Sequence, residues 1–207
     1  MRSPRVANVA EYLNPASASW KRIKPADISL IPAPLGLQPT EYIRKSWEGR
    51  AYGKATRIEV ATVHDGKTWA IRASWKGVSP GGRDFPDALA VALPVTGKPI
   101  LALMGAPDAP IHIVRWAANK DGAQSLLATG IGQSRPGAVI KCTAQAKPDG
   151  DIWNVVISRP LGIGKEVAPL VAGKQTGIGF ALWSGGNDER AGIKAFSTDW
   201  VELTLDA

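Results

Sequence analysis

The segment 180–200, FALWSGGNDERAGIKAFSTDW, combines aromatic, glycine and charged residues in one short stretch. It begins as an apolar strand, breaks at Gly185-Gly186 and resumes an apolar alternation near its end. The polar loop between the two strands carries four charged residues: Asp188, Glu189, Arg190 and Lys194. A loop this polar, between two aromatic-rich strands, suits a side chain that is held at the rim of a site. Lys194 is the candidate for that side chain.

Residue types that serve catalysis are few. The chain has two histidines, His64 and His112, and neither has a cysteine or carboxylate at the spacing of a metal site. His64 lies in a His-Asp-Gly-Lys turn, which predicts a solvated ring. His112 alternates with Ile111 and Ile113, so its side chain is expected to face away from theirs. No nucleophile elbow and no P-loop motif is present.

Cys142 is the single cysteine, so no intramolecular disulfide can form. Its strand-like surroundings, AVIKCTAQA, predict a small buried hydrophobe, and without a base nearby it is a poor nucleophile. The glycine-rich run 130–137, GIGQSRPG, is not followed by a helical pattern and makes a weak phosphate cradle. A sandwich hydrolase that acts alone is therefore the weakest of the functional classes considered.

The composition predicts one globular domain, residues 1–207. Hydrophobic residues make up 44% and charged residues 21% of 207, enough for one sizeable core. The net charge is +7, but the chain has no dense Lys/Arg run and no nucleic-acid motif. A solvated surface or an acidic protein partner is therefore expected, and no nucleic acid.

Aromatic usage is unbalanced: eight tryptophans stand against three phenylalanines and three tyrosines. Tryptophan is rarely fully buried, so some rings are expected at a cleft, a ligand or an interface. Exposed tryptophans on a β-sandwich can also bind glycans by stacking. A carbohydrate-binding module with a tryptophan platform is therefore the main alternative.

Short alternating segments separated by turn residues predict a mainly β protein, an antiparallel β-sandwich with a few short flanking helices. The clearest hairpin joins TRIEVATVH (56–64) to TWAIRASW (68–75) through Asp65-Gly66. Residues 1–50 are interrupted by prolines and are expected to wrap irregularly around the sandwich. Trp20 and Trp47 are expected to anchor that segment.

Further elements are expected along the chain. Strands are predicted at 28–35, 88–95, 99–104, 111–117, 138–146, 151–159, 177–184 and 199–205. A glycine- and proline-rich loop is expected at 76–88, and a loop with little pattern at 121–136. Residues 166–173 predict a short helix that ends at Gly173.

From about residue 55 to 205 the chain resembles the haem b-binding γ subunits of the type II dimethyl sulfoxide reductase family, most of all the ethylbenzene dehydrogenase type. The most specific block is WSGGN-x-ER-x-G-x-K, residues 183–194. The Met104-Gly105 turn, followed by an alternating strand that ends in Trp116, is next. The blocks RIEVATVHDGKTWAIRASW, ALAVALPV and DIWNVVISRPL match in order and spacing.

The resemblance implies that the sandwich binds one haem b, with Met104 and Lys194 as the axial ligands of the iron. A thioether ligand tends to raise the reduction potential. An amine ligand must first lose its proton, which costs a free lysine about 4–5 kcal/mol at pH 7, so Lys194 must be buried against the haem. No CxxCH motif is present, which excludes covalent c-type attachment.

Haem propionates need cationic or hydrogen-bonding partners, and large rings can flank a macrocycle. The candidates for the propionates are Arg115, Lys141 and Arg190, and those for the pocket walls are Trp116 and Trp183. Core packing is an equal alternative for both tryptophans.

The resemblance also implies partners. A molybdenum α subunit would carry the catalytic site, and an iron–sulfur β subunit would complete the heterotrimer. The γ subunit would have no catalytic residue and would relay electrons to an external acceptor such as a c-type cytochrome. The ethylbenzene type favours a complex that hydroxylates a hydrocarbon-type substrate without O2.

No apolar run approaches the length needed to span a membrane. The first residues, MRSPRVANVAEYLNP, lack the apolar region of a signal peptide. Taken alone, these features favour the cytoplasm. The resemblance instead implies the periplasm, reached in the folded state together with a twin-arginine partner.

Overall fold

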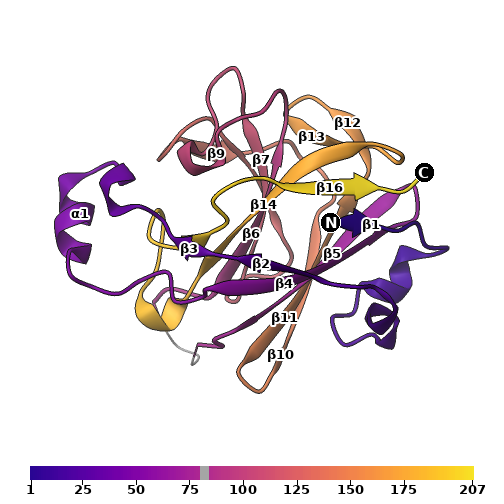
Figure 1. The fold of residues 1–207 in the computed structure, drawn as a ribbon, viewed down its shortest axis with the longest axis horizontal. Coiled ribbons are helices and arrows are strands. Elements are labelled where there is room, and N and C mark those ends of the chain that lie inside the picture. Colours follow the sequence, from indigo (N-terminus) through magenta and orange to yellow (C-terminus); the bar gives the residue numbers. More distant parts are fainter. Residues whose placement is uncertain (80–83) are drawn as a thin grey trace.

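Two sheets pack face to face in the computed structural model, which describes residues 1–79 and 84–207 (Figure 1). Their strands pair antiparallel except β1, which runs parallel to β16. The first sheet has the order β10-β11-β5-β4-β2. Its strands are β2 (Ala26–Ser29), β4 (Arg57–His64), β5 (Thr68–Lys76), β10 (Thr143–Asp149) and β11 (Ile152–Pro160). The expected hairpin of β4 and β5 is confirmed, with His64 opposite Trp69.

The second sheet has the order β1-β16-β14-β6-β7-β8-β9. Its strands are β1 (Arg2–Ser3), β6 (Ala88–Pro94), β7 (Ile111–Ala117), β8 (Gln124–Ala128), β9 (Ser134–Pro136), β14 (Gln175–Trp183) and β16 (Val201–Leu205). At one end of β14, β15 (Ala195–Phe196) pairs with it and also with β3 (Ile31–Pro32). A separate two-stranded sheet contains β12 (Gly162–Gly164) and β13 (Val167–Leu170).

The helices are short and lie outside the sheets. The α-helix α1 spans Glu41–Trp47, and the 3-10 helices are η1 (Val9–Tyr12), η2 (Ala18–Arg22), η3 (Leu35–Leu37), η4 (Leu101–Leu103) and η5 (Gly185–Asn187). The Thr40 hydroxyl caps α1 by accepting a hydrogen bond from the backbone N–H of Ile43. The predicted fold class, a β-sandwich with a few short helices, is confirmed.

The core lies between the two sheets and follows from strand alternation. Trp69, Ile71, Ala73 and Trp75 of β5 share the inward face, as expected. They meet the inward residues of β6: Leu89, Val91 and Leu93. On the outer side of β4 and β5, η1 and η2 cover a smaller apolar cluster that includes the buried Trp20.

Some expected elements are wrong. Residues 166–173 form no helix, because Glu166 has a φ of +62° and the chain turns there into β13. Residues 99–104 form no strand, because the chain coils into η4 and ends it at Met104, whose φ is +58°. Residues 121–136, expected as a loop with little pattern, contain two strands. β8 pairs with β7, and β9 pairs with β8.

Other boundaries shift because of long-range pairing. Residues 28–35 divide between β2 in the first sheet and β3 in the second. Residues 138–142 precede β10, and the β10–β11 turn lies at Gly150-Asp151. Within the expected loop 76–88, residues 80–83 lie outside the described part of the chain.

The N-terminal segment connects the two sheets. After β2 the chain crosses to the second sheet, pairs through β3, forms α1 and returns to the first sheet at β4 (Figure 1). Trp20 and Trp47 are each 4% exposed. Trp20 packs in the apolar cluster on β4 and β5, as predicted, whereas the ring neighbour of Trp47 is Tyr52, so its anchoring role stays a prediction. Among the helices of the described residues, none is long and apolar enough to cross a bilayer.

Candidate functional site

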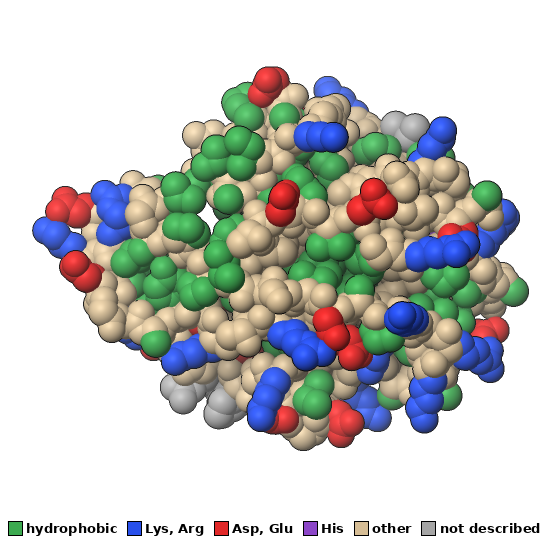
Figure 2. Space-filling model, viewed as in Figure 1, with side chains coloured by type: hydrophobic (Ala, Val, Ile, Leu, Met, Phe, Trp, Pro, Cys, Tyr) green, Lys and Arg blue, Asp and Glu red, His purple; other side chains and the backbone are tan. Residues whose placement is uncertain are grey.

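A cavity of about 460 Å³ lies on the outer face of the second sheet, beneath residues 31–43. We call these residues the covering segment, because Ala33, Pro34, Leu37, Gln38 and Ile43 form one wall of the cavity. In Figure 2 the surface is hollowed between the α1 region and the main body, and hydrophobic side chains surround the hollow. The volume falls within the range of small-molecule sites, about 300–1,000 Å³.

Alternation between large and small residues makes room for the cavity. On β6, Leu89, Val91 and Leu93 point into the core, whereas Ala90 and Ala92 point outward and line the cavity. The neighbouring strand β14 repeats the pattern with Ala181. The sheet therefore offers a flat floor of small side chains. This pattern is visible in ALAVALP, and it is a signal that the sequence interpretation missed.

Met104 enters the cavity from the turn that follows η4. Its backbone is left-handed, which is uncommon for a residue other than glycine and indicates local strain. Gly105 follows with a φ of +85°, and a Cβ there would lie 2.9 Å from the carbonyl oxygen of Ala109. This turn therefore requires glycine and fixes where the methionine side chain begins.

Lys194 enters the same cavity, from the chain just before β15. Its Nζ lies 3.6 Å from Sδ of Met104, although the two residues are 90 positions apart. Burial lowers the pKa of Lys194 to about 8. Removal of its proton at pH 7 then costs about 1–2 kcal/mol, compared with about 4–5 kcal/mol for a free lysine. The site thus brings a thioether and a readily deprotonated amine together.

Two buried carboxylates hold the loop that precedes Lys194. Glu189, 1% exposed, accepts hydrogen bonds from the backbone N–H groups of Ser184 and Lys54. Asp87, 2% exposed, accepts from the backbone N–H of Gly185 and from the indole N–H of Trp153. A buried carboxylate bonded in this way fixes the loop to both sheets.

Strained backbone is concentrated around the two candidate ligands. Positive φ angles occur at Met104 and, in the Lys194 loop, at Asp188 and Ala191. Among the described residues, Glu166 is the remaining example outside glycine. Residues held in such conformations gather at functional sites, because the surrounding structure must impose them.

Arg115 and Trp183 also line the cavity. The guanidinium carbon of Arg115 lies 5.5 Å from the centre of the Trp183 ring, and the ammonium of Lys194 lies 5.3 Å from it. Burial lowers the pKa of Arg115. No carboxylate of the described residues lies within 4.0 Å of this guanidinium, so it is available to an anionic group.

The other proposed site residues lie elsewhere. Trp116 is on the opposite face of β7 from Arg115, where it packs edge-on against Trp75 and Trp153 in the core. Arg190 is exposed, with its guanidinium 4.3 Å from the centre of the Phe85 ring. Lys141 is exposed in the chain before β10. The structure does not bring these three residues to the cavity.

Gln38 is a cavity residue that the sequence interpretation missed. It is 4% exposed, and its amide donates to the carbonyl of Gly192 at 3.2 Å. A Cβ at position 192 would fall 1.8 Å from Oε1 of Gln38, so glycine is required for this contact. Together with a hydrogen bond from Ala33 N–H to the carbonyl of Lys194, it ties the covering segment to the Lys194 loop.

Both histidines are buried. The expectation that His64 is solvated is wrong, because the N-terminal chain pairs beside it: Val6 N–H donates to the His64 carbonyl and His64 N–H to that of Pro4. His112 faces away from Ile111 and Ile113, as expected, and burial lowers its pKa to about 4. Burial raises the pKa of the Cys142 thiol to about 11. Within the described residues, no three His, Cys, Asp or Glu side chains form a metal cluster.

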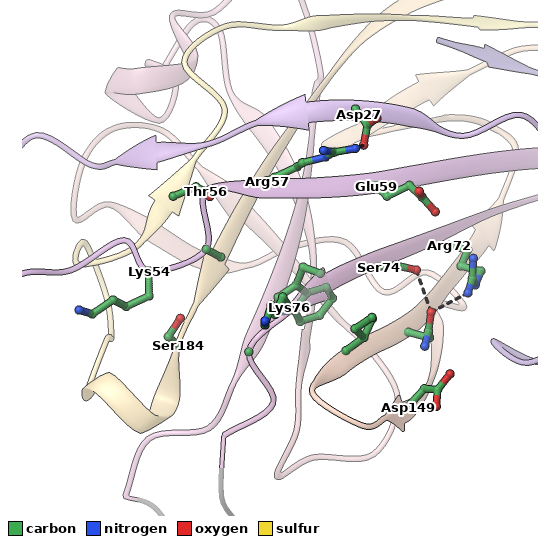
Figure 3. A pocket seen from close by; sticks show the side chains of 15 residues that line it. Asp27, Lys54, Thr56, Arg57, Glu59, Arg72, Ser74, Lys76, Asp149 and Ser184 are labelled. Atoms are coloured by element: carbon green, nitrogen blue, oxygen red, sulfur yellow. Dashed lines mark hydrogen bonds and ion pairs between the residues drawn. The ribbon is translucent and has the colours of Figure 1, made fainter.

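A second cleft, of about 730 Å³, lies on the outer face of the first sheet (Figure 3). Its polar side chains bond to one another: Arg72 and Ser74 both donate to the Asn154 side chain, and Arg57 pairs with Asp27 at 2.6 Å. All eight tryptophans lie in the described residues, and none is classed as exposed. Trp153, Trp183 and Trp200 are half-buried and the other five are buried, so among the described residues no exposed tryptophan offers the flat platform that the carbohydrate-binding alternative predicts.

The fold and the cavity define a β-sandwich protein with a covered, largely apolar cavity. Carbohydrate-binding module family 9 from Caldicellulosiruptor kristjanssonii, solved with glucose, shares this fold with a TM-score of 0.53. The match covers 100% of this chain and 95% of that one at 10% identity, so the likeness is one of fold. No protein-family model matches the sequence.

Sequence relatives are more specific. Chlorate reductase subunit gamma of Ideonella dechloratans is 32% identical over 207 residues, covering 96% of this chain and 83% of the relative. A protein of Haloferax mediterranei, provisionally named respiratory nitrate reductase heme subunit ORF7, is 27% identical, covering 91% and 67%. Dimethylsulfide dehydrogenase subunit gamma of Rhodovulum sulfidophilum is 25% identical, covering 94% and 76%. The chain belongs to the gamma subunits of the type II dimethyl sulfoxide reductase family of molybdoenzymes.

Proposed function

We propose that this chain binds one haem b in the cavity, with Met104 and Lys194 as axial ligands, and relays electrons within a molybdoenzyme complex. The observation that carries the proposal is the meeting of Met104 Sδ and Lys194 Nζ at 3.6 Å on the cavity wall. One relative is named a heme subunit, which supports the choice of cofactor. Haem supplies reversible one-electron chemistry when bound.

The residues of the cavity suit this group. The floor formed by Ala90, Ala92 and Ala181 accepts a flat apolar ring. Arg115 offers a cation to a propionate. Met104 and Lys194 would hold the iron through the thioether sulfur and the deprotonated amine, and their long unbranched side chains can adjust to the group.

The protein adjusts the electron affinity of the group. A thioether ligand and an apolar surrounding both favour the ferrous state, and therefore raise the reduction potential. Burial lowers the pKa of Lys194 to about 8, so iron competes with a proton that is held only weakly. The covering segment would shield the bound group from solvent.

The partners follow from the family. We propose a heterotrimer with a molybdenum α subunit and an iron–sulfur β subunit, with electrons passed to an external acceptor such as a c-type cytochrome. The gamma subunits of chlorate reductase and dimethylsulfide dehydrogenase support this assembly. Co-purification of the tagged chain with both subunits is the expected result, and mixing with reduced or oxidised cytochrome c measures the last transfer.

The resemblance to the ethylbenzene dehydrogenase type supports hydroxylation of a hydrocarbon-type substrate by the whole complex. The names of the relatives instead mention chlorate, nitrate and dimethylsulfide. The purified complex must therefore be assayed with hydrocarbons and with each of these three compounds. We also propose the periplasm, with the cytoplasm as the alternative. Fractionation of cells that express the complex decides between the two.

An absorption spectrum of the co-expressed, purified complex tests haem binding. A Soret band and low-spin α and β bands are expected. Met104→Ala and Lys194→Ala should each change the low-spin spectrum, whereas the neighbouring Leu103→Ala and the exposed Lys174→Ala should leave it unchanged. A ligand variant with the wild-type spectrum would show that its residue does not bind iron.

A further inference from the structure

A guanidinium bridges the two sheets inside the core. Arg159 on β11 is 1% exposed and points across the sandwich. Its Nε donates to the carbonyl of Pro160 at 3.0 Å and one terminal nitrogen donates to that of Ala168 at 2.9 Å. The other terminal nitrogen lies 3.2 Å from Nδ1 of His112 on β7. Every partner of this buried cation is thus a neutral acceptor.

Nothing nearby neutralises the charge. No carboxylate of the described residues lies within 4.0 Å of Arg159. Cys142 is the neighbouring ionisable group that could offset the charge of Arg159, but burial raises its pKa to about 11, so the thiol is neutral at pH 7. His112 accepts from Arg159 through Nδ1, which leaves its Nε2–H to donate to the hydroxyl of Ser125 at 3.1 Å. Burial lowers the pKa of Arg159 to about 10, so the guanidinium stays charged at neutral pH.

A buried charge without a counter-charge is costly, and neutral side chains could fill the same space at lower free energy. The two sheets share an extensive apolar core, so packing alone does not require a cation at this point. The position of Arg159 relative to the cavity offers a reason for the charge.

Only one strand layer separates Arg159 from the cavity. His112 lies between Ile111 and Ile113 on β7, and both isoleucines line the cavity on the other face of that strand. Ser125 likewise precedes Leu126, another lining residue. The field of the guanidinium therefore crosses a dry layer of low dielectric, where salt screens it little.

We infer that Arg159 is a fixed buried charge that raises the reduction potential of the haem in the cavity, an inference that rests on the haem binding proposed above. Reduction of ferric to ferrous iron removes one positive charge from the site. A neighbouring cation repels the ferric state more than the ferrous state and so favours reduction.

Redox titration of the haem in the intact complex, followed at the α band, tests the inference. In Arg159→Gln the ferric-to-ferrous ratio at fixed ambient potential should rise several-fold. Raising the ionic strength should leave this shift in place. Arg72→Gln is the matched control, because Arg72 is half-buried on the outer face of the first sheet and should keep the wild-type ratio. An unchanged ratio in haem-loaded Arg159→Gln would overturn the inference.

A second pair of variants keeps Arg159 and its hydrogen bonds. Cys142→Asp places a carboxylate near the guanidinium, and Cys142→Asn is its neutral match. The aspartate variant should shift the ratio toward ferric relative to the asparagine variant, and equal ratios would overturn the inference even if Arg159→Gln does not fold. If the wild-type complex shows no Soret band, haem binding itself is contradicted. If the haem-loaded variants keep the wild-type ferric-to-ferrous ratio, only the role of Arg159 is contradicted.

Discussion

The outer faces of the two sheets have the same backbone geometry and different properties. On the second sheet the outward side chains of Ala90 and Ala92 on β6 and of Ala181 on β14 are small, and the covering segment closes over them to form an apolar cavity. On the first sheet the outward side chains at one end of β4 and β5 are charged or polar and line an open cleft, in which Arg72 and Ser74 bond to Asn154 (Figure 3). At the other end of these strands η1 and η2 cover apolar residues. Small outward residues and a covering segment thus give a closed cavity on one sheet, whereas charged and polar side chains give an open cleft on the other.

Filling the alanine floor should have the largest effect. In Ala92→Leu the new side chain occupies the cavity, so haem occupancy of the purified complex should fall more than tenfold, as read from the Soret absorbance per protein. The protein itself should stay folded, because the added volume enters an existing cavity. Ser74→Leu is the control on the other sheet, and its occupancy should match wild type. Full occupancy in Ala92→Leu would contradict the proposed position of the ring.

Acid should destabilise the protein through His112, which is buried behind the cavity. Its pKa is lowered from 6.5 to about 4, so the unfolded chain binds a proton more readily than the folded one. The stability that His112 contributes is complete above pH 6.5 and is lost as the pH falls toward 4. The loss across this window should be about 2–3 kcal/mol. Urea unfolding at several pH values measures it.

His112→Gln should flatten that dependence, because glutamine does not titrate. A variant that loses stability between pH 6.5 and 4 as steeply as wild type would show that other groups dominate. Burial also lowers the pKa of His64, so this second histidine acts in the same direction and sets the residual slope.

The buried carboxylate of Glu189 should contribute more stability than the half-buried carboxylate of Glu59 on the polar face. Glu189→Ala leaves the backbone N–H groups of Ser184 and Lys54 without their acceptor, which should cost about 1–3 kcal/mol in free energy of unfolding. The low-spin haem spectrum should weaken, since Lys194 follows this loop. Glu59→Ala on β4 is the control, with a change below about 0.5 kcal/mol. If Glu189→Ala and Glu59→Ala lose the same free energy of unfolding, the buried hydrogen bonds of Glu189 add no stability beyond that of a surface carboxylate.

The smallest effect is expected in the polar cleft. Asp27 and Arg57 pair at 2.6 Å, but their side chains are 55% and 67% exposed. Solvent and salt screen such a pair, so Asp27→Asn should cost less than about 1 kcal/mol, and the cost should disappear in high salt. Haem occupancy should not change. A larger, salt-independent cost measured by thermal unfolding would mean that this face is more than a solvated surface.

Much of the fold could be predicted from the sequence. The β4–β5 hairpin has clear alternation and an Asp-Gly turn, and the structure confirms both the pairing and the inward face of Trp69 and Trp75. Predictions failed where local pattern was weak and distant pairing decided. β8 and β13 owe their extended form to neighbouring strands, and η4 replaces a strand because Met104 adopts a left-handed backbone.

The candidate site divides in the same way. The block at 183–194 and the Met104-Gly105 turn pointed to the family and to two candidate ligands, and family membership is confirmed by its relatives. Arg115 and Trp183 reach the cavity, whereas Trp116, Arg190 and Lys141 do not. Position on a strand determines a face, so Arg115 and Trp116, as neighbours, had to point to opposite sides. The sequence interpretation did not use that constraint.

By itself the sequence determined which side of a clearly alternating strand such as β5 is core, because period-two alternation is a local property. It also determined that Met104 and Lys194 lie beside glycine-rich turns. The tertiary structure alone decided that these two residues meet, that Gln38 ties the covering segment to Gly192, and that Arg159 lies behind the cavity wall. Such contacts depend on sheet order and on the closure of long loops, which no local pattern encodes.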